Sequence, residues 1–394
     1  MALAALRQLR PWKAAARRGS FTPRSSARLA RDSLADQQLP VFKYVGERAR
    51  RKDRVFVWGF SYTGALGIPS FVVPDVGGKK PRRLQLTPYR LDMQEKISSV
   101  ACGYGFTLLS SQTADITKVW GMGLNKDSQI GFHRSRRDRT RGYEYILEPS
   151  PVPLPLDRPQ ETLVLQVSCG RAHSLILTNN EGVFSMGNNS YGQCGRKVIE
   201  GETYSESQLI HRVEEFDGRV VQVACGQDHS LFRTDKGEVY ACGWGADGQT
   251  GLGHYNITSA PTKLSGDIAG VKIIQISTYG DFCLAVSEEG DLFGWGNSEY
   301  LQLASITEST QVNVPRLLPF MEVGKVKQAV CGGTISALLN DRGELFVWGK
   351  NLRGCLGIGK TDDQYFPWRV TVPGNVIDVA CGVDHTVALV KSFT

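Results

Sequence analysis

The sequence predicts an all-β protein, a β-propeller in which six similar sheets stand around a common axis. Two short patterns that repeat along most of the chain at nearly constant spacing predict the sheets. Glycine is frequent, at 43 of 394 residues, and evenly spread, which is typical of a chain with many tight turns. No segment beyond the N-terminal region shows sustained helical periodicity.

The first pattern is a small residue and a cysteine before a glycine-containing turn, followed by an apolar strand. Because apolar residues resume directly after each turn, the pattern predicts two strands joined by a tight connection. It occurs as ACGYGFTLL from residue 101, SCGRAHSLI from 168, ACGQDHSLF from 224, STYGDFCLA from 277, VCGGTISAL from 330 and ACGVDHTVA from 380.

The second pattern is an apolar strand that ends before a glycine. It occurs as VFVWG from residue 55, VWGMG from 119, VFSMG from 183, VYACG from 239, LFGWG from 292 and LFVWG from 345. In four units 17 residues separate the two patterns, as from Cys169 to Met186, and in the fifth unit 18 separate Cys102 from Trp120. Turn sequences with glycine lie between them, so each unit predicts short antiparallel strands joined by hairpins.

One such sheet has unpaired edges and cannot bury both faces alone, which favours radial stacking into a propeller. The chain begins the repeat with the second pattern alone, at 55–67, and leaves it with the first pattern alone, at 379–390. We therefore expect the N- and C-terminal strands to combine into the last blade and close the ring.

These two patterns resemble the regulator-of-chromosome-condensation repeat family, and the resemblance covers about residues 54–394. Together with the N-terminal composition, the segment GLNKDSQIGFHRSR from residue 123 is similar to a mitochondrial member of that family. The resemblance implies a propeller of that type, usually with seven blades, whereas we count five complete units and one composite unit. We therefore expect that this chain lacks one unit, at a joint near residues 331–345.

The composition of the N-terminal region predicts a targeting peptide. Residues 1–31 hold eight basic side chains and no acidic one, and apolar residues recur on one face of a helix from Leu3 to Trp12. We expect a mitochondrial transit peptide over 1–36, a linker over 37–53 and the propeller over 54–394, in the matrix or on the matrix side of the inner membrane. A disordered basic tail that binds nucleic acid, or a nuclear signal, is the alternative. Because the whole chain carries +7, the remainder has a net charge of about −1.

Residue types that often carry chemistry fall on repeat positions here. The repeated cysteines are spread around the ring, so we expect small buried residues rather than metal ligands. His173, His229 and His385 also recur in register, which indicates structural side chains that bond neighbouring backbone. Residues 243–248 match a dinucleotide-binding motif by letter but lack the helix that the motif needs. The sequence predicts no metal site, no cofactor, no small-molecule substrate and no enzymatic machinery of its own.

Two long insertions, 68–91 and 132–149, follow the second pattern in neighbouring units. Both leave the repeat at the same point, so we expect them on one face, where they would form a basic surface with Tyr143 and Tyr145 available for stacking. Solvated loops without a binding role are the alternative. The candidate binding residues are Lys79, Lys80, Arg82, Arg83, Arg134, Arg136, Arg137, Arg139 and Arg141.

A rigid ring with elaborated loops is suited to binding, but the fold alone does not fix the partner. One expectation is a scaffold in the stability of large-subunit ribosomal RNA and in mitoribosome assembly, with mitochondrial ribosomal RNA and RNA-modifying or assembly proteins as partners. The other, implied by the family resemblance, is a guanine-nucleotide exchange factor for a dynamin-like GTPase of the inner membrane that promotes mitochondrial fusion. The family's exchange residues cannot be mapped onto this sequence, and the scaffold role does not need them, so the sequence favours the scaffold. A peripheral association with the inner membrane stays open.

Overall fold

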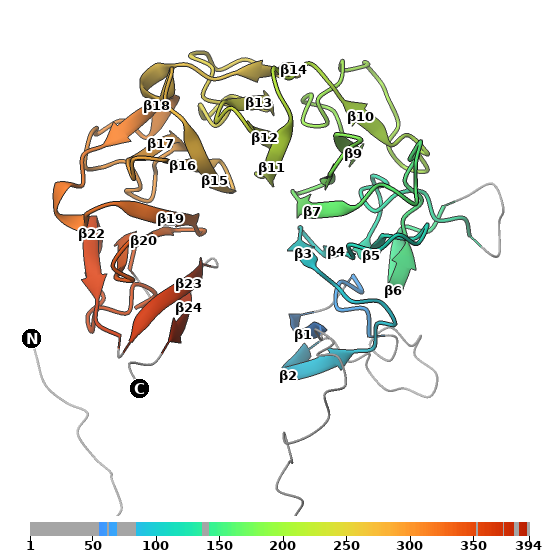
Figure 1. Cartoon of the computed structure of the whole chain (residues 1–394), viewed down its shortest axis with the longest axis horizontal. Coiled ribbons are helices and arrows are strands. Elements are labelled where there is room, and N and C mark those ends of the chain that lie inside the picture. Colours follow the sequence, from blue (N-terminus) through green and yellow to red (C-terminus); the bar gives the residue numbers. More distant parts are fainter. Residues whose placement is uncertain are drawn as a thin grey trace, which may run out of the picture. The chain divides into compact units, whose positions relative to one another are not determined.

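The computed structural model describes residues 55–60, 63–68, 84–135, 142–351, 354–372, 374–381 and 386–391. Five four-stranded antiparallel sheets, blades I to V, are built in chain order (Figure 1). Within each blade every strand pairs with the next along the chain. Blade I comprises β3 (Ser99–Cys102), β4 (Phe106–Ser110), β5 (Val119–Leu124) and β6 (Tyr145–Pro151). Blade II comprises β7 (Val164–Cys169), β8 (His173–Thr178), β9 (Val183–Gly187) and β10 (His211–Val213).

Blades III to V repeat this arrangement. Blade III comprises β11 (Val220–Cys225), β12 (His229–Thr234), β13 (Val239–Gly243) and β14 (Thr258–Lys263). Blade IV comprises β15 (Ile273–Tyr279), β16 (Phe282–Ser287), β17 (Leu292–Asn297) and β18 (Gln311–Leu318). Blade V comprises β19 (Val326–Cys331), β20 (Ile335–Asn340), β21 (Leu345–Gly349) and β22 (Gln364–Val370). Two short 3₁₀ helices, η2 (Gly266–Ile268) and η3 (Met321–Val323), lie in connections.

Burial follows the order of strands within a blade. The two middle strands are buried along almost their whole length, as in β16 and β17, because both of their faces meet a neighbouring sheet. The first strand alternates between buried and partly exposed residues, and most residues of the fourth strand are partly or fully exposed. The two repeated patterns of the sequence therefore correspond to the first and second strands and to the third strand of each blade.

Successive blades meet through their first strands: β3 contacts β7, β7 contacts β11, β11 contacts β15, β15 contacts β19, and β19 contacts β23. Separate apolar clusters fill the space between neighbouring blades, such as the one that joins Leu284 and Trp348 of blades IV and V. First strands in mutual contact and cores between sheets are the arrangement of a β-propeller, so the predicted fold class is confirmed.

A glutamine clasp connects the first strands of neighbouring blades. Gln222 of blade III accepts a hydrogen bond from the backbone N–H of Ile276 (3.1 Å) and donates one to the carbonyl of the same residue (2.9 Å). Gln166 makes the same two bonds with Val223, and Gln275 makes them with Ala329. We call this pair of bonds the clasp. At these three places the clasp fixes the position of one blade, along the strand direction, relative to the next.

The two ends of the repeat do not share a sheet among the described residues. The strands β1 (Val55–Phe60) and β2 (Leu84–Leu91) form an N-terminal half-sheet, and β23 (Asn375–Cys381) and β24 (Thr386–Lys391) form a separate C-terminal half-sheet. The expected composite blade is therefore not formed here. The described part of the chain also holds no helix of the length and apolar character needed to span a bilayer.

Candidate functional site

The turns between first and second strands lie on the same face as the connections between third and fourth strands. Antiparallel order requires this, and hydrogen bonds show it: Leu124 N–H donates to the Gly105 carbonyl (2.8 Å), and Trp244 N–H donates to the Asp228 carbonyl (2.9 Å). We call this side of the propeller the turn face. Because both long insertions connect a third strand to a fourth strand, both arise on the turn face, as the sequence predicts.

The bases of the two insertions are both anchored to blade I. Before the first insertion, Thr63 Oγ1 donates to the Gly105 carbonyl (2.5 Å). At the second, Arg134 and Gly142 form an isolated β-bridge, and Tyr143 N–H donates to the His133 carbonyl (2.8 Å). Of the nine candidate basic residues the structure describes Arg134, which is exposed. The others lie outside the described residues: Lys79, Lys80, Arg82, Arg83, Arg136, Arg137, Arg139 and Arg141.

A chain of backbone hydrogen bonds connects the first turns of four blades. Tyr104 N–H donates to the Gly170 carbonyl (3.3 Å), Arg171 N–H donates to the Gln227 carbonyl (2.9 Å), and Gln227 N–H donates to the Gly280 carbonyl (2.7 Å). These bonds therefore fix the position of each turn relative to the next one. The side chains of these turns are brought together from segments far apart in the sequence.

We define the turn cluster as six side chains of these turns. Arg171 forms an ion pair with Asp228, with 2.7 Å between Nη2 and Oδ2, and its Nε donates to Oδ1 (3.1 Å). Tyr104 Oη donates to Gln227 Oε1 (3.4 Å). The members are Tyr104, Arg171, Gln227, Asp228, Tyr279 and Asp281.

Burial sets the charge state of the cluster. Burial, with smaller contributions from the carboxylates of Asp247 and Asp228, raises the pKa of Asp281 to about 6, while a hydrogen bond from Gln249 (3.0 Å) opposes the shift. Burial also raises the pKa of Asp228, against the lowering effect of Arg171. The turn face thus presents one acidic group that changes its charge near neutral pH.

Sequence reasoning did not find the turn cluster, because the repeat positions that it uses vary from unit to unit. The signal was present in the two residues between the turn glycine and the next strand, which are Arg171-Ala172 in one unit and Gln227-Asp228 in the next. Only the packing of the blades shows that these variable positions meet.

The recurring histidines are structural, as predicted, and each of the two described ones also reaches a side chain of the next blade. His173 Nε2 lies 3.0 Å from Ser230 Oγ in the next blade, and His229 Nε2 lies 3.2 Å from Cys283 Sγ. Both rings are fully buried, and burial lowers the pKa of each to about 3, so they are neutral. His385 lies outside the described residues.

All nine cysteines lie within the described residues, and none forms a disulfide bond. Cys225 and Cys331 are buried as expected, whereas Cys169 and Cys381 are partly buried. The expectation is wrong for Cys102, which is exposed because no first strand of a preceding blade covers it. The described residues hold no cluster of side chains suited to a metal ion, and no helix follows residues 243–248.

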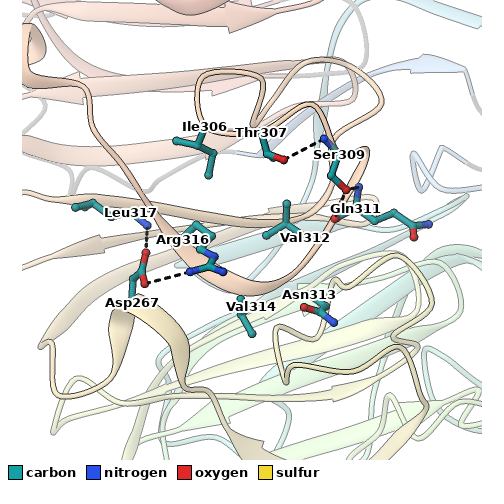
Figure 2. Close-up of a pocket in the computed structure, with 10 residues that line it drawn as sticks. All are labelled: Asp267, Ile306, Thr307, Ser309, Gln311, Val312, Asn313, Val314, Arg316 and Leu317. Atoms are coloured by element: carbon teal, nitrogen blue, oxygen red, sulfur yellow. Dashed lines mark hydrogen bonds and ion pairs between the residues drawn. The ribbon is translucent and has the colours of Figure 1, made fainter.

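The structure also has an open pocket of about 480 Å³ on the outer rim, along the fourth strand of blade IV (Figure 2). Its charged members, Asp267 and Arg316, form an ion pair at 3.7 Å, and Asp267 accepts a hydrogen bond from Leu317 N–H (2.8 Å). Its other lining residues are neutral, and none is a histidine, cysteine or lysine. This lining contains no pair of a nucleophile and a base, so the pocket is not a candidate catalytic site.

Comparisons with known proteins agree with this description. Residues 49–333 match a family described as RCC1-like domain, and residues 342–389 match the regulator of chromosome condensation (RCC1) repeat. The "RCC1-like G exchanging factor-like protein" of Mus musculus is 63% identical, over 99% of this chain and 98% of its own length. Its Homo sapiens counterpart is 64% identical, over 95% of both chains.

Solved structures share the fold. That of human WBSCR16 has a TM-score of 0.71 and 64% identity, and covers 86% of this chain and 100% of its own. Prp20p from Saccharomyces cerevisiae, at 20% identity and a TM-score of 0.58, shows the fold alone; the match covers 86% of this chain and 91% of Prp20p.

These relatives carry additional sequence inside the aligned region. The mouse alignment spans 455 positions, and this chain has 394 residues, so at least 61 positions of the mouse protein have no counterpart here. That length is close to one unit, since the clasped residues Gln222 and Ile276 are 54 residues apart. The two family matches also stop and resume between 333 and 342, within the region where we expect the joint.

Proposed function

Because this chain belongs to the RCC1 repeat family, we propose that it acts by binding macromolecules on the turn face, with a GTPase as one partner whose nucleotide exchange it accelerates. Two relatives that are more than 60% identical over nearly their whole length are named as G exchanging factor-like. The supporting observation in the structure is the turn cluster, which gathers charged and aromatic side chains from four blades on a rigid base.

The chemistry of the cluster suits this role. An exchange factor lowers the barrier to GDP release when it binds the nucleotide-free GTPase most tightly. GTPases hold the phosphates with a lysine and Mg²⁺, and carboxylates are suitable ligands for both. Asp281 and Asp228 are carboxylates in the cluster, and Tyr104, 47% exposed, provides contact area beside them. We further propose that the GTPase is a dynamin-like protein of the mitochondrial inner membrane.

A nucleotide-release assay tests this proposal. The purified protein lacking residues 1–36 is mixed with a dynamin-like GTPase loaded with fluorescent GDP, and release is followed in excess GTP. We expect acceleration with the native chain and little with Tyr104→Ala. Tyr365→Ala is the matched control, because Tyr365 is 53% exposed on the outer strand of blade V. Release at the intrinsic rate with the native chain would refute the exchange role.

A second function rests on the basic insertions. We propose that they bind mitochondrial ribosomal RNA, which would make the protein a scaffold for large-subunit maturation. Arg134 is exposed at the base of one insertion, and Lys126 Nζ lies 5.8 Å from the ring centre of Tyr145, which is 38% exposed. A cation beside an exposed aromatic ring is suited to stacking with bases and to phosphate contact.

Crosslinking in mitochondria followed by RNA sequencing tests the scaffold role. We expect recovery of ribosomal RNA that is lost when Arg134 and the four following arginines of the insertion become glutamate. The double change Arg219→Glu and Lys272→Glu is a control for charge, because both residues lie in connections to or from first strands, on the side opposite the turn face. Equal loss per reversed charge with both sets would mean that only net charge matters. A reporter fused to residues 1–40 tests the proposed mitochondrial address, which nuclear or diffuse signal would exclude.

A further inference from the structure

A second pocket lies on the turn face between blades I and II. Its volume is about 330 Å³. The connection from β5 to β6 forms one wall, and the connection from β9 to β10 forms the other. The lining includes Ser128, Phe132, Tyr143 and Glu144 of the first connection and Ser205 and Glu206 of the second. The pocket therefore opens beside the base of the basic insertion at 132–149.

A departure from the repeat at Ser128 makes room for this pocket. Blades II and III have glycine at the equivalent turn position, Gly192 and Gly248. A Cβ there would lie 2.5 Å and 2.7 Å, respectively, from a Cα of the fourth strand of the next blade, so that strand packs directly on the turn. Ser128 carries a Cβ, and the fourth strand of the next blade, β10, has only 3 residues. The pocket occupies the place of the missing strand contact.

Polar contacts hold both walls of the pocket. In the connection from β9 to β10, Arg196 donates two hydrogen bonds to Glu202 (2.6 and 3.0 Å), and the two side chains are only 12% and 16% exposed. In the connection from β5 to β6, Asn125 Nδ2 donates to the carbonyls of Gly131 (2.9 Å) and Tyr143 (3.3 Å). The pocket is therefore formed before a ligand arrives, which reduces the entropy that binding costs.

The lining offers hydrogen-bonding groups without partners. Ser128 is only 3% exposed, yet its hydroxyl makes no hydrogen bond within the described residues. The carboxylates of Glu144 and Glu206 are exposed and form no ion pair with any residue that the structure describes. Ser128 and Glu206 also have left-handed backbone, with φ of 55° and 67°, which residues other than glycine rarely adopt. Such strain is typical of binding sites.

A flat ligand with adjacent N–H donors fits this lining. Tyr143 is 38% exposed and Phe132 is partly buried, so both rings offer surface on which a nucleobase can stack. A carboxylate only accepts hydrogen bonds. Guanine presents two adjacent N–H groups on its Watson–Crick edge, and the two oxygens of one carboxylate can accept both. Adenine and cytosine place an acceptor nitrogen beside their amino group, and the N–H of uracil lies between two carbonyl oxygens, so these bases fit worse.

We propose that the pocket binds one unpaired guanine of an RNA strand. The base stacks on Tyr143, its two N–H groups donate to the carboxylate of Glu206 on the opposite wall, and its O6 accepts from the Ser128 hydroxyl. This inference rests on the proposed RNA role and adds the base that the protein reads. An arginine of a partner protein has a similar fork of N–H donors, but the five arginines at 134–141 repel a basic segment and attract RNA.

Fluorescence anisotropy of labelled oligonucleotides measures this preference. The purified chain lacking residues 1–36 is titrated into oligouridylates of one length that carry guanine, adenine, cytosine or uracil at a single central position. Length and charge are then equal, so differences in Kd report the base alone. We expect the guanine oligonucleotide to bind at least about fivefold more tightly than the other three.

Glu206→Gln tests the assigned contact. The amide has the shape of the carboxylate but offers a donor in place of one acceptor, so we expect the preference for guanine to fall below about twofold. Glu200→Gln is the matched control, because Glu200 is exposed in the same connection, lies outside the pocket lining and loses the same charge. It should leave the preference unchanged.

Equal binding of all four oligonucleotides, or a guanine preference that survives Glu206→Gln, overturns the guanine site and leaves the RNA role standing. Failure of every oligonucleotide to bind overturns both. Guanosine monophosphate that binds as tightly as the guanine oligonucleotide would assign the pocket to a free nucleotide instead. An arginine peptide whose binding is lost in Glu206→Gln and retained in Glu200→Gln would assign it to a protein. A guanine preference that is lost in Glu206→Gln and retained in Glu200→Gln supports the proposal.

Discussion

Arg171 of blade II and Asp228 of blade III form an ion pair between equivalent turns of neighbouring blades, and the side chain of Asp228 is only 7% exposed. The guanidinium binds both carboxylate oxygens. The pair therefore joins two blades at the turn face and also defines the centre of the turn cluster.

Removal of the Arg171 charge should destabilise the protein. In Arg171→Met the carboxylate of Asp228 remains buried without its partner, so we expect a loss of about 2 kcal/mol in the free energy of unfolding, measured by urea denaturation. Arg219→Met is the control, because Arg219 lies 3.9 Å from Asp235 and both side chains are well exposed. It should change stability by less than about 0.5 kcal/mol. Equal effects of the two changes would contradict this prediction.

Asp281 should make stability depend on pH. Its pKa is about 6 in the folded protein against 3.8 for an ordinary aspartate, so the folded state binds more protons between these values. The stability of the native chain should therefore contain a contribution that falls as pH rises from about 4 to about 6. Asp281→Asn lacks it and keeps an acceptor for Gln249, so at pH 7.5 it should be more stable by on the order of 1 kcal/mol. Near pH 3.5 the difference should vanish; a difference that does not change with pH would count against the shifted pKa.

The contact between a buried histidine and the next blade should tolerate cysteine in place of serine as the partner of the histidine. Ser230 Oγ–H donates to the Gln193 carbonyl (2.6 Å), so it accepts its other hydrogen bond from His173 Nε2–H. Ser230→Ala leaves both groups unpaired and should cost about 1–2 kcal/mol in thermal or urea unfolding. Ser230→Cys copies the next joint, where Cys283 takes this place, and should cost less than about 1 kcal/mol. The reverse order of the two variants would show that the hydrogen bonds do not matter.

Tyr104→Ala should separate binding from stability. The side chain is 47% exposed and makes one long hydrogen bond, so its removal should change the free energy of unfolding by less than about 0.5 kcal/mol. If the turn cluster contacts a GTPase, the loss of an aromatic contact should lower the rate of GDP release at least about tenfold. Stability is measured by urea denaturation on the same preparation as release. A parallel loss of stability would assign Tyr104 a structural role.

The fold could be predicted because the sequence of each repeat unit contains the strand pattern of one blade. The spacing of Cys225 and Cys242 recurs in other units, and it predicts the order of strands within a blade. The composite blade could not be predicted reliably, because both ends contain the correct half-patterns whether or not they meet. The closure of a ring depends on the angle of every joint, and the pattern of a single unit does not report that angle.

The candidate site was only partly predictable for a related reason. The insertions were visible as interruptions of the repeat, and chain order was enough to assign them to one face. The turn cluster was not visible, because Arg171 and Asp228 are 57 residues apart and occupy turn positions that differ between units. Their proximity is a property of blade packing alone.

The clasps reach only from one blade to its immediate neighbour, as from Gln222 to Ile276. An in-frame excision of one whole unit can therefore leave every remaining interblade contact with an equivalent partner. The irregularity then lies not at the site of excision but at the two half-sheets at the ends of the repeat, which do not share a sheet in the part of the chain that the structure describes. In a protein of this architecture, the removal of one unit therefore changes the number of blades without changing the cores that remain.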